Sequence, residues 1–119
     1  MVRFASTALG VTLLAFVTSA FAQDQAPAYE GVLTTYVCAD GAEIDIAYLN
    51  MASGLSLAVV RADGVMHVME TIISGSGVRY ATAGEGERFV WWSKGNEGSL
   101  YRGDDGAEEI RHQDCVGKD

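Results

Sequence analysis

A small hydroxyl and an ammonium group occupy two glycine-rich turns within residues 74–98 of the sequence. The first turn reads Gly75-Ser76-Gly77, and the second reads Lys94-Gly95-Asn96. Glycine lets the backbone adopt a positive φ angle, or lets the tip of a loop approach another surface closely. If the strands between the turns fold back on one another, Ser76 and Lys94 would form a paired polar probe. Whether the two tips lie side by side depends on the fold.

The sequence lacks the patterns of common enzymes and metal sites. A serine nucleophile elbow needs G-x-S-x-G before a helix, whereas Ser74 stands two residues before Ser76 and no helical pattern follows. The glycines also lack the following helix of a phosphate or dinucleotide site. His67 and His112 show no ligand spacing with the cysteines, so each is expected to be an ordinary strand residue. We expect no enzyme, no metal and no cofactor, with the paired carboxylates of a glycosidase as the weaker alternative.

Two adjacent tryptophans, Trp91 and Trp92, lie between the turns. Neighbouring side chains of a strand point to opposite faces, so one ring is expected in the core and the other at or near the surface. The sequence does not indicate which one faces outward. An exposed Trp is often an interface anchor, although an ordinary structural role is the simpler interpretation.

The first 22 residues are predicted to be a signal peptide. Met1-Val2-Arg3 is basic, residues 5–20 are apolar, and Ala20-Phe21-Ala22 has the small-x-small pattern of a cleavage site. A transmembrane anchor is the alternative, because the apolar run is of borderline length. No cysteine stands at the cleavage point to carry a lipid. We therefore expect an exported protein of the periplasm with no stable membrane anchor.

The charge balance limits the classes of partner. The chain has 16 acidic and 8 basic residues, a net charge of -8, and loss of Arg3 with the signal peptide would make it -9. Such a chain repels nucleic acid and anionic membranes, and it favours a basic partner or simply solubility.

The two cysteines, Cys38 and Cys115, predict a disulfide, because an isolated pair in an exported protein usually forms one. It would close a loop spanning nearly the whole domain, a constraint of about 4 kcal/mol in the chain-entropy model. It would also tie the first strand to the last.

Period-two alternation dominates the remaining chain and predicts an all-β fold. In residues 43–48, for example, Ile44, Ile46 and Tyr48 share one face. Asp63-Gly64 is a signal for a type I′ hairpin. Eight strands are expected, at residues 33–38, 43–48, 55–61, 65–73, 79–82, 88–93, 99–102 and 107–114. Their regular spacing favours an antiparallel β-barrel over residues 33–119, after a polar leader at residues 23–32.

Three segments resemble signatures of one family, the bacterial membrane-bound and periplasmic inhibitors of C-type lysozyme. Residues 76–80 resemble its S-G-x-x-Y motif, and residues 89–95 resemble its Y-x-x-x-T-K-G motif. Residues 36–41 are also similar, and Cys115 stands where the closing cysteine of the family would be. Because this chain lacks a lipid-bearing cysteine, it resembles the periplasmic branch.

The resemblance implies an eight-stranded antiparallel barrel whose two signature loops enter the substrate cleft of C-type lysozyme. Ser76 would hydrogen-bond the catalytic carboxyls, and Lys94 would place its ammonium against the ionised one. That enzyme needs one protonated acid and one carboxylate in a confined cleft, where an ammonium pairs strongly. C-type lysozymes are strongly basic, so an acidic inhibitor should be steered toward them.

The resemblance also implies supporting roles for residues around the two tips. Gly77, Tyr80, Phe89, Ser93 and Gly95 would shape the loops. Phe89 and Ser93 belong to the same signature, although they stand where the family has Tyr and Thr.

Two other functions compete with inhibition. A lipocalin-like barrel could bind a small molecule, with Trp91 or Trp92 at its mouth. Against it, about a hundred residues in eight strands leave an interior that side chains mostly fill. The second alternative is an assembly module that forms a homodimer through an exposed Trp or a strand edge.

Overall fold

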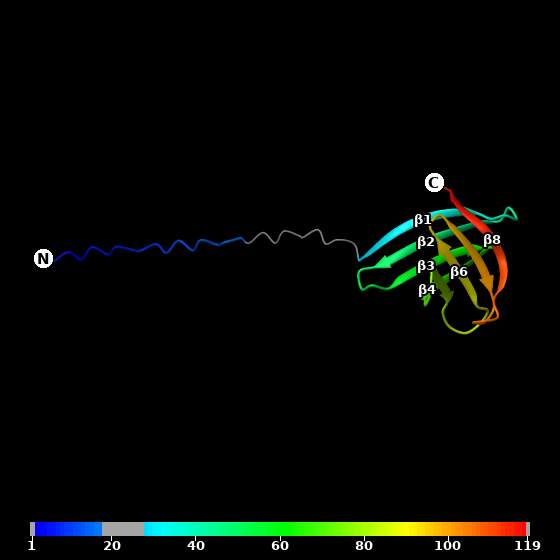
Figure 1. Ribbon diagram of the computed structural model, residues 1–119. Coiled ribbons are helices and arrows are strands. Elements are labelled where there is room, and N and C mark those ends of the chain that lie inside the picture. Colours follow the sequence, from blue (N-terminus) through cyan, green and yellow to red (C-terminus); the bar gives the residue numbers. More distant parts are fainter. Residues whose placement is uncertain (1, 18–27, 119) are drawn as a thin grey trace.

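Eight antiparallel strands close into a barrel in the computed structural model, which describes residues 2–17 and 28–118 (Figure 1). Each strand pairs with the next one along the chain, and β8 returns to pair with β1. The predicted all-β antiparallel barrel is therefore confirmed. The strands are β1 (Tyr29–Val37), β2 (Glu43–Met51), β3 (Ser56–Ala62), β4 (Val65–Ile72), β5 (Val78–Thr82), β6 (Phe89–Lys94), β7 (Glu97–Arg102) and β8 (Glu109–Lys118).

The N-terminal predictions fall largely on residues outside the description. The proposed cleavage point after Ala22 and the first half of the polar leader lie there, whereas residues 2–17 are exposed and form neither strand nor helix. Among the described residues, no helix combines the length and the apolar character needed to cross a membrane. β1 begins at Tyr29, four residues before the predicted start of the barrel at Leu33. The reason is tertiary, because this first part of β1 pairs with the last part of β2.

Inward-facing side chains from all parts of the barrel fill its interior. On β2, Ile44 and Ile46 are buried while Glu43 and Asp45 are exposed, as the alternation predicts. Trp91 is fully buried, and its indole N–H donates a 2.8 Å hydrogen bond to the hydroxyl of Tyr48. The other buried apolar residues of this core include Tyr36, Ala58, Val60, Ala62, Met69, Tyr80 and Leu100. The packed interior does not favour the lipocalin-like alternative.

A glycine on the neighbouring strand makes room for the buried indole. A Cβ atom on Gly98 would lie 2.5 Å from Cη2 of Trp91, well inside van der Waals contact. Trp91 and Gly98 come from the paired strands β6 and β7. The large ring therefore depends on a residue without a side chain on β7.

The barrel closes along a short seam between β1 and β8. Only three residue pairs join these strands, the outermost being Thr35 with Lys118 and Val37 with Val116. The predicted disulfide between Cys38 and Cys115 is present beside this seam, and both cysteines are buried. It links the residue after β1 to β8, so the first and last strands are tied covalently.

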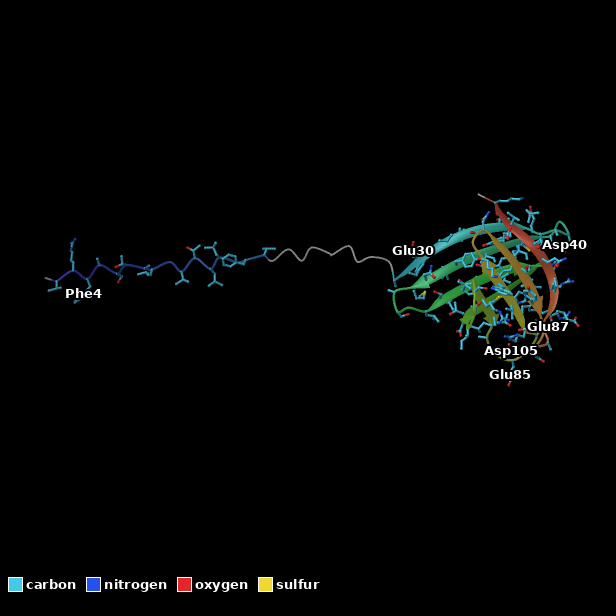
Figure 2. The ribbon with its side chains drawn as sticks, viewed as in Figure 1. Phe4, Glu30, Asp40, Glu85, Glu87 and Asp105 are labelled. Atoms are coloured by element: carbon cyan, nitrogen blue, oxygen red, sulfur yellow. A yellow bond between two sulfur atoms is a disulfide. The ribbon has the colours of Figure 1, made fainter. Side chains whose placement is uncertain are left out.

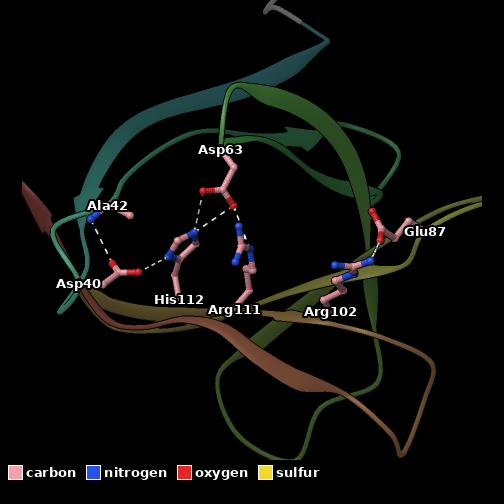
Figure 3. A network of polar contacts seen from close by, with 7 residues as sticks. All are labelled: Asp40, Ala42, Asp63, Glu87, Arg102, Arg111 and His112. Atoms are coloured by element: carbon pink, nitrogen blue, oxygen red, sulfur yellow. Dashed lines mark hydrogen bonds and ion pairs between the residues drawn. The ribbon is translucent and has the colours of Figure 1, made fainter.

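A buried histidine on β8 connects the β1–β2 loop with the β3–β4 turn, at the end of the barrel where β1 ends (Figure 3). His112 on β8 places Nδ1 2.6 Å from a carboxylate oxygen of Asp40, and Nε2 3.0 Å from both carboxylate oxygens of Asp63. Arg111 also donates to Asp63, at 3.2 Å. These four residues are called the His112 network below. His112 lies on a strand, as expected, and barrel closure also brings it to acids distant in sequence, which the sequence did not indicate.

The pKa values in the His112 network move in opposite directions. Burial alone would lower the pKa of His112, but the hydrogen bonds that its ring donates to Asp63 and Asp40 outweigh burial and raise that pKa. The hydrogen bond from His112 lowers the pKa of Asp63. The backbone N–H of Ala42, followed by His112, lowers the pKa of Asp40. The arrangement therefore favours an imidazolium between two carboxylates.

Candidate functional site

The two glycine-rich turns meet at one end of the barrel. In an antiparallel meander, alternate connections lie at the same end, so the β4–β5 loop and the β6–β7 turn share an end. β5 pairs with β6, and Val78 stands opposite Ser93 at the last register position before these connections. The hydroxyl-bearing Ser76 and the ammonium-bearing Lys94 therefore come from adjacent segments. Both residues are exposed.

Gly77 brings the two segments into direct contact. Its φ angle is +63°, and a Cβ atom on it would lie 2.5 Å from Cγ of Lys94 and 2.9 Å from Nε1 of Trp92. A side chain at this position would be strained in its backbone and would collide with both neighbours. Gly95 also has a positive φ, +56°, within the β6–β7 turn, but open space surrounds it. The close approach therefore depends on Gly77, whereas Gly95 supplies only turn geometry.

Trp92, whose role the sequence left open, lies between the two tips. Its ring points away from the core and is half-buried, so the fold assigns Trp91 to the interior and Trp92 to the surface. The indole N–H donates a 2.8 Å hydrogen bond to the backbone carbonyl of Ser76. The ammonium of Lys94 lies 4.8 Å from the centroid of the ring, within the range of a cation–π interaction.

Ser76 has a fixed backbone and an accessible side chain. Its carbonyl accepts a second hydrogen bond, at 2.6 Å, from the hydroxyl of Ser74. In the part of the chain that the structure describes, the hydrogen bonds at Ser76 involve this carbonyl, and no ion pair engages Lys94. The hydroxyl and the ammonium are therefore both presented for an external partner.

The remaining residues of the two signatures are distributed over the barrel. Tyr80 is buried, with its ring 5.7 Å from that of Tyr48, and burial raises its pKa. Ser93 lines the mouth of the barrel at the loop end together with these two tyrosines. Phe89 lies at the opposite end of β6 from Lys94, where its ring packs 4.5 Å from that of His67. Phe89 is therefore distant along the strand from the tips that it was predicted to shape.

The surface around the barrel carries many acidic side chains, as the net charge of -8 requires. Figure 2 shows Glu30, Asp40 and Glu85 projecting from different loops and strands. Arg79, the cross-strand partner of Trp92, and Arg88 share one acidic partner, since they lie 3.0 and 3.4 Å from the carboxylate of Glu108. The exposed ammonium of Lys94 thus stands out against an acidic background.

The model of a protein family described as "Membrane-bound lysozyme-inhibitor of c-type lysozyme" matches residues 36–109. This match spans more than half of the chain and includes both tips. The chain belongs to this family. The resemblance seen in the short signatures is therefore confirmed at the level of the family.

Two similar proteins in the lysozyme-inhibitor family are both named membrane-bound lysozyme inhibitor of C-type lysozyme. One, from Pseudomonas aeruginosa, is 40% identical over 67 residues, which cover 56% of this chain and 49% of that protein. The chain thus spans about half the length of this relative. The other, from Cupriavidus necator, is 35% identical over 103 residues, which cover 80% of this chain and 78% of that protein. Because these relatives are inhibitors, the expectation that the chain is not an enzyme is confirmed.

A solved structure supports the fold assigned to this family member. The periplasmic lysozyme inhibitor of C-type lysozyme from Salmonella typhimurium superposes with a TM-score of 0.66 and 22% sequence identity. The match covers 76% of this chain and all of that one. At this identity the likeness establishes a shared barrel.

Proposed function

We propose that this protein inhibits C-type lysozyme in the periplasm by inserting the Ser76 and Lys94 tips into the catalytic cleft of the enzyme. The observation that supports this mechanism best is that the two tips lie together, with Gly77 and Trp92 between them. Family membership supports the identity of the partner.

The chemistry of the two tips is complementary to the proposed target. The Ser76 hydroxyl can donate to one carboxyl oxygen and accept from a protonated one. The Lys94 ammonium supplies three donors and a positive charge for an ionised carboxylate. In a cleft that excludes water, this charge pair is stronger than at an open surface. The inhibitor would therefore occupy the cleft and satisfy both carboxyl groups.

The periplasmic location in this proposal rests on the predicted signal peptide. The solved relative with the same fold is named a periplasmic inhibitor, which supports this location. Fractionation of expressing cells tests it, since the proposal requires the protein in the periplasmic fraction without detergent.

An inhibition assay tests the mechanism directly. The purified protein should suppress lysozyme-dependent clearing of a cell-wall suspension, and the double variant Ser76→Ala/Lys94→Ala should lose most of this effect while retaining its melting temperature. Arg61→Ala is the matched control, because it also removes one exposed positive charge but lies on β3 away from the tips. Full potency in the double variant would refute the assigned roles, whereas no inhibition by the unaltered protein would refute the function.

A homodimer is a separate proposal that is compatible with inhibition. The outer face of β1–β4 exposes apolar side chains, among which Leu33 is 84% and Met66 is 68% exposed. This face includes neither Ser76 nor Lys94, so a dimer formed there would leave both tips accessible. Light scattering over a range of concentrations measures whether the dimer exists.

A further inference from the structure

Trp92 contacts both tips with different parts of the same ring system. Its N–H group holds the carbonyl of Ser76 at 2.8 Å, and its aromatic face lies 4.8 Å from the ammonium of Lys94. The two tips have no direct hydrogen bond or ion pair to each other among residues 28–118. The indole is therefore the side chain that connects them.

The indole is itself held by residues on the flanking strands. Arg79, its cross-strand partner on β5, places its guanidinium carbon 5.9 Å from the ring centroid. Arg79 is fixed in turn by Glu108, at 3.0 Å. On the other side, the ring of Tyr101 on β7 lies 6.5 Å away. These contacts restrict the ring more than a solvent-facing Trp on a single strand would be restricted.

The contact of Trp92 with Lys94 affects the free energy of binding to a partner. Lysine has a flexible four-carbon stem, and ordering it on binding costs conformational entropy. A ring that already holds the ammonium reduces this cost before the partner arrives. The same ring fixes the backbone of Ser76, so that a single side chain sets the spacing between the hydroxyl and the charge.

We infer that Trp92 is a positioning residue, which orders the Ser76 and Lys94 tips for binding without being a principal contact of the partner. This inference rests on the proposed function for its effect on inhibition. The ordering itself is a property of the free protein and can be measured without any partner.

The first test is a nuclear magnetic resonance comparison of the free protein with Trp92→Ala and Trp92→Phe. Ring currents from Trp92 should shift the side-chain methylene protons of Lys94 upfield in the unaltered protein. The shift should disappear in Trp92→Ala and persist in Trp92→Phe, which keeps an aromatic face but has no N–H group. Lys118 serves as the internal control, because its ammonium pairs with Glu43 on another part of the surface. Unchanged Lys94 resonances in Trp92→Ala would overturn the inference.

The second test is a double-variant cycle of lysozyme affinity with Trp92→Ala and Lys94→Ala. Loss of one hydrogen bond and one cation–π contact predicts that Trp92→Ala alone raises the dissociation constant about tenfold. In the Lys94→Ala background the same change should raise it only about threefold, because the part that acts through the ammonium is already absent. Trp92→Phe should restore only the part of the affinity that acts through the ammonium, with a dissociation constant about threefold above that of the unaltered protein. Fully additive losses would contradict positioning and identify Trp92 as a direct contact.

The two tests separate the inference from the function on which it rests. If the unaltered protein does not bind lysozyme, the proposed function fails, while the Lys94 resonances still decide whether Trp92 orders the tips. If Trp92→Ala does not fold, Trp92→Phe still isolates the N–H group. It should then raise the dissociation constant about threefold with the Lys94 shift intact, and an unchanged constant would overturn the role of the bond to Ser76.

Discussion

Removal of the Cys38–Cys115 disulfide should bring the barrel close to its limit of stability. The cysteines are 77 residues apart in the sequence, and the chain-entropy relation for a loop of this length gives about 4.5 kcal/mol at 25 °C. Domains of this size typically have unfolding free energies of about 5–15 kcal/mol. The double variant Cys38→Ala/Cys115→Ala therefore loses a large part of the total.

The disulfide is a large part of what holds the barrel closed between β1 and β8. Only three residue pairs connect the two strands, so few other contacts compensate for the lost covalent tie. Both cysteines are buried, and their replacement by Ala leaves small gaps that add to the cost rather than reduce it.

Urea denaturation followed by near-ultraviolet circular dichroism measures the effect. The unfolding free energy should fall by about 4.5 kcal/mol, and the m-value should rise because the unfolded chain without the link exposes more surface. A loss below about 2 kcal/mol with an unchanged m-value would refute the reasoning, since the link would then place little constraint on the unfolded chain.

Three further predictions concern the tips, the His112 network and the charge. Gly77→Ala should weaken inhibition at least tenfold and cost about 1–3 kcal/mol of stability, because Ala is strained at a φ of +63° and collides with Lys94. Gly75→Ala is the control in the same loop, because open space surrounds Gly75. Equal potency of the two variants would contradict a close approach of Gly77 to Lys94. The loss of stability caused by His112→Gln should be largest between about pH 4 and 6.5. Because the pKa of His112 is raised on folding, its contribution to stability is complete below its ordinary pKa of 6.5 and is lost as the pH rises through its pKa in the folded protein. Because the pKa of Asp63 is lowered, its contribution is complete above its ordinary pKa of 3.8 and is lost as the pH falls through its pKa in the folded protein. Thermal melts of both proteins from pH 3 to 9 measure this window, and a difference that grows above pH 7 would be inconsistent with it. The association rate with a basic lysozyme should fall about tenfold from low to high salt, with a smaller change in the dissociation rate, because the net charge of -8 acts mainly on the encounter of the two proteins. Surface plasmon resonance measures the two rates separately. An association rate that does not depend on salt would exclude electrostatic steering.

Local patterns in the sequence were sufficient for most of the barrel. The alternation of Ile44 and Ile46 with exposed acids marks β2 correctly, because one face of each strand packs inward. Asp63 and Gly64 both have positive φ angles, 51° and 77°, as the predicted type I′ hairpin requires. Such features depend on neighbours in the chain, so they can be recognised without the fold.

Features that depend on register and closure could not be predicted in this way. The choice between Trp91 and Trp92 follows from which face of β6 turns inward, and two adjacent aromatic residues give no preference. The contacts of His112 are 72 residues from Asp40 and 49 from Asp63, distances that only the closed barrel bridges. Phe89 appeared to belong with Lys94 through a shared signature, yet the length of β6 separates them.

The direction of the strands has a practical consequence for immobilising this protein. β1 starts and β8 finishes at the end of the barrel that carries the Ser76 and Lys94 tips, and Gly117 hydrogen-bonds Asn96 in the neighbouring turn. A tag attached directly before β1 or directly after β8 would therefore draw that end toward a bead or sensor chip. The β5–β6 connection around Glu85 emerges on the opposite side, so coupling there would orient the captured molecules with their tips toward the flowing sample.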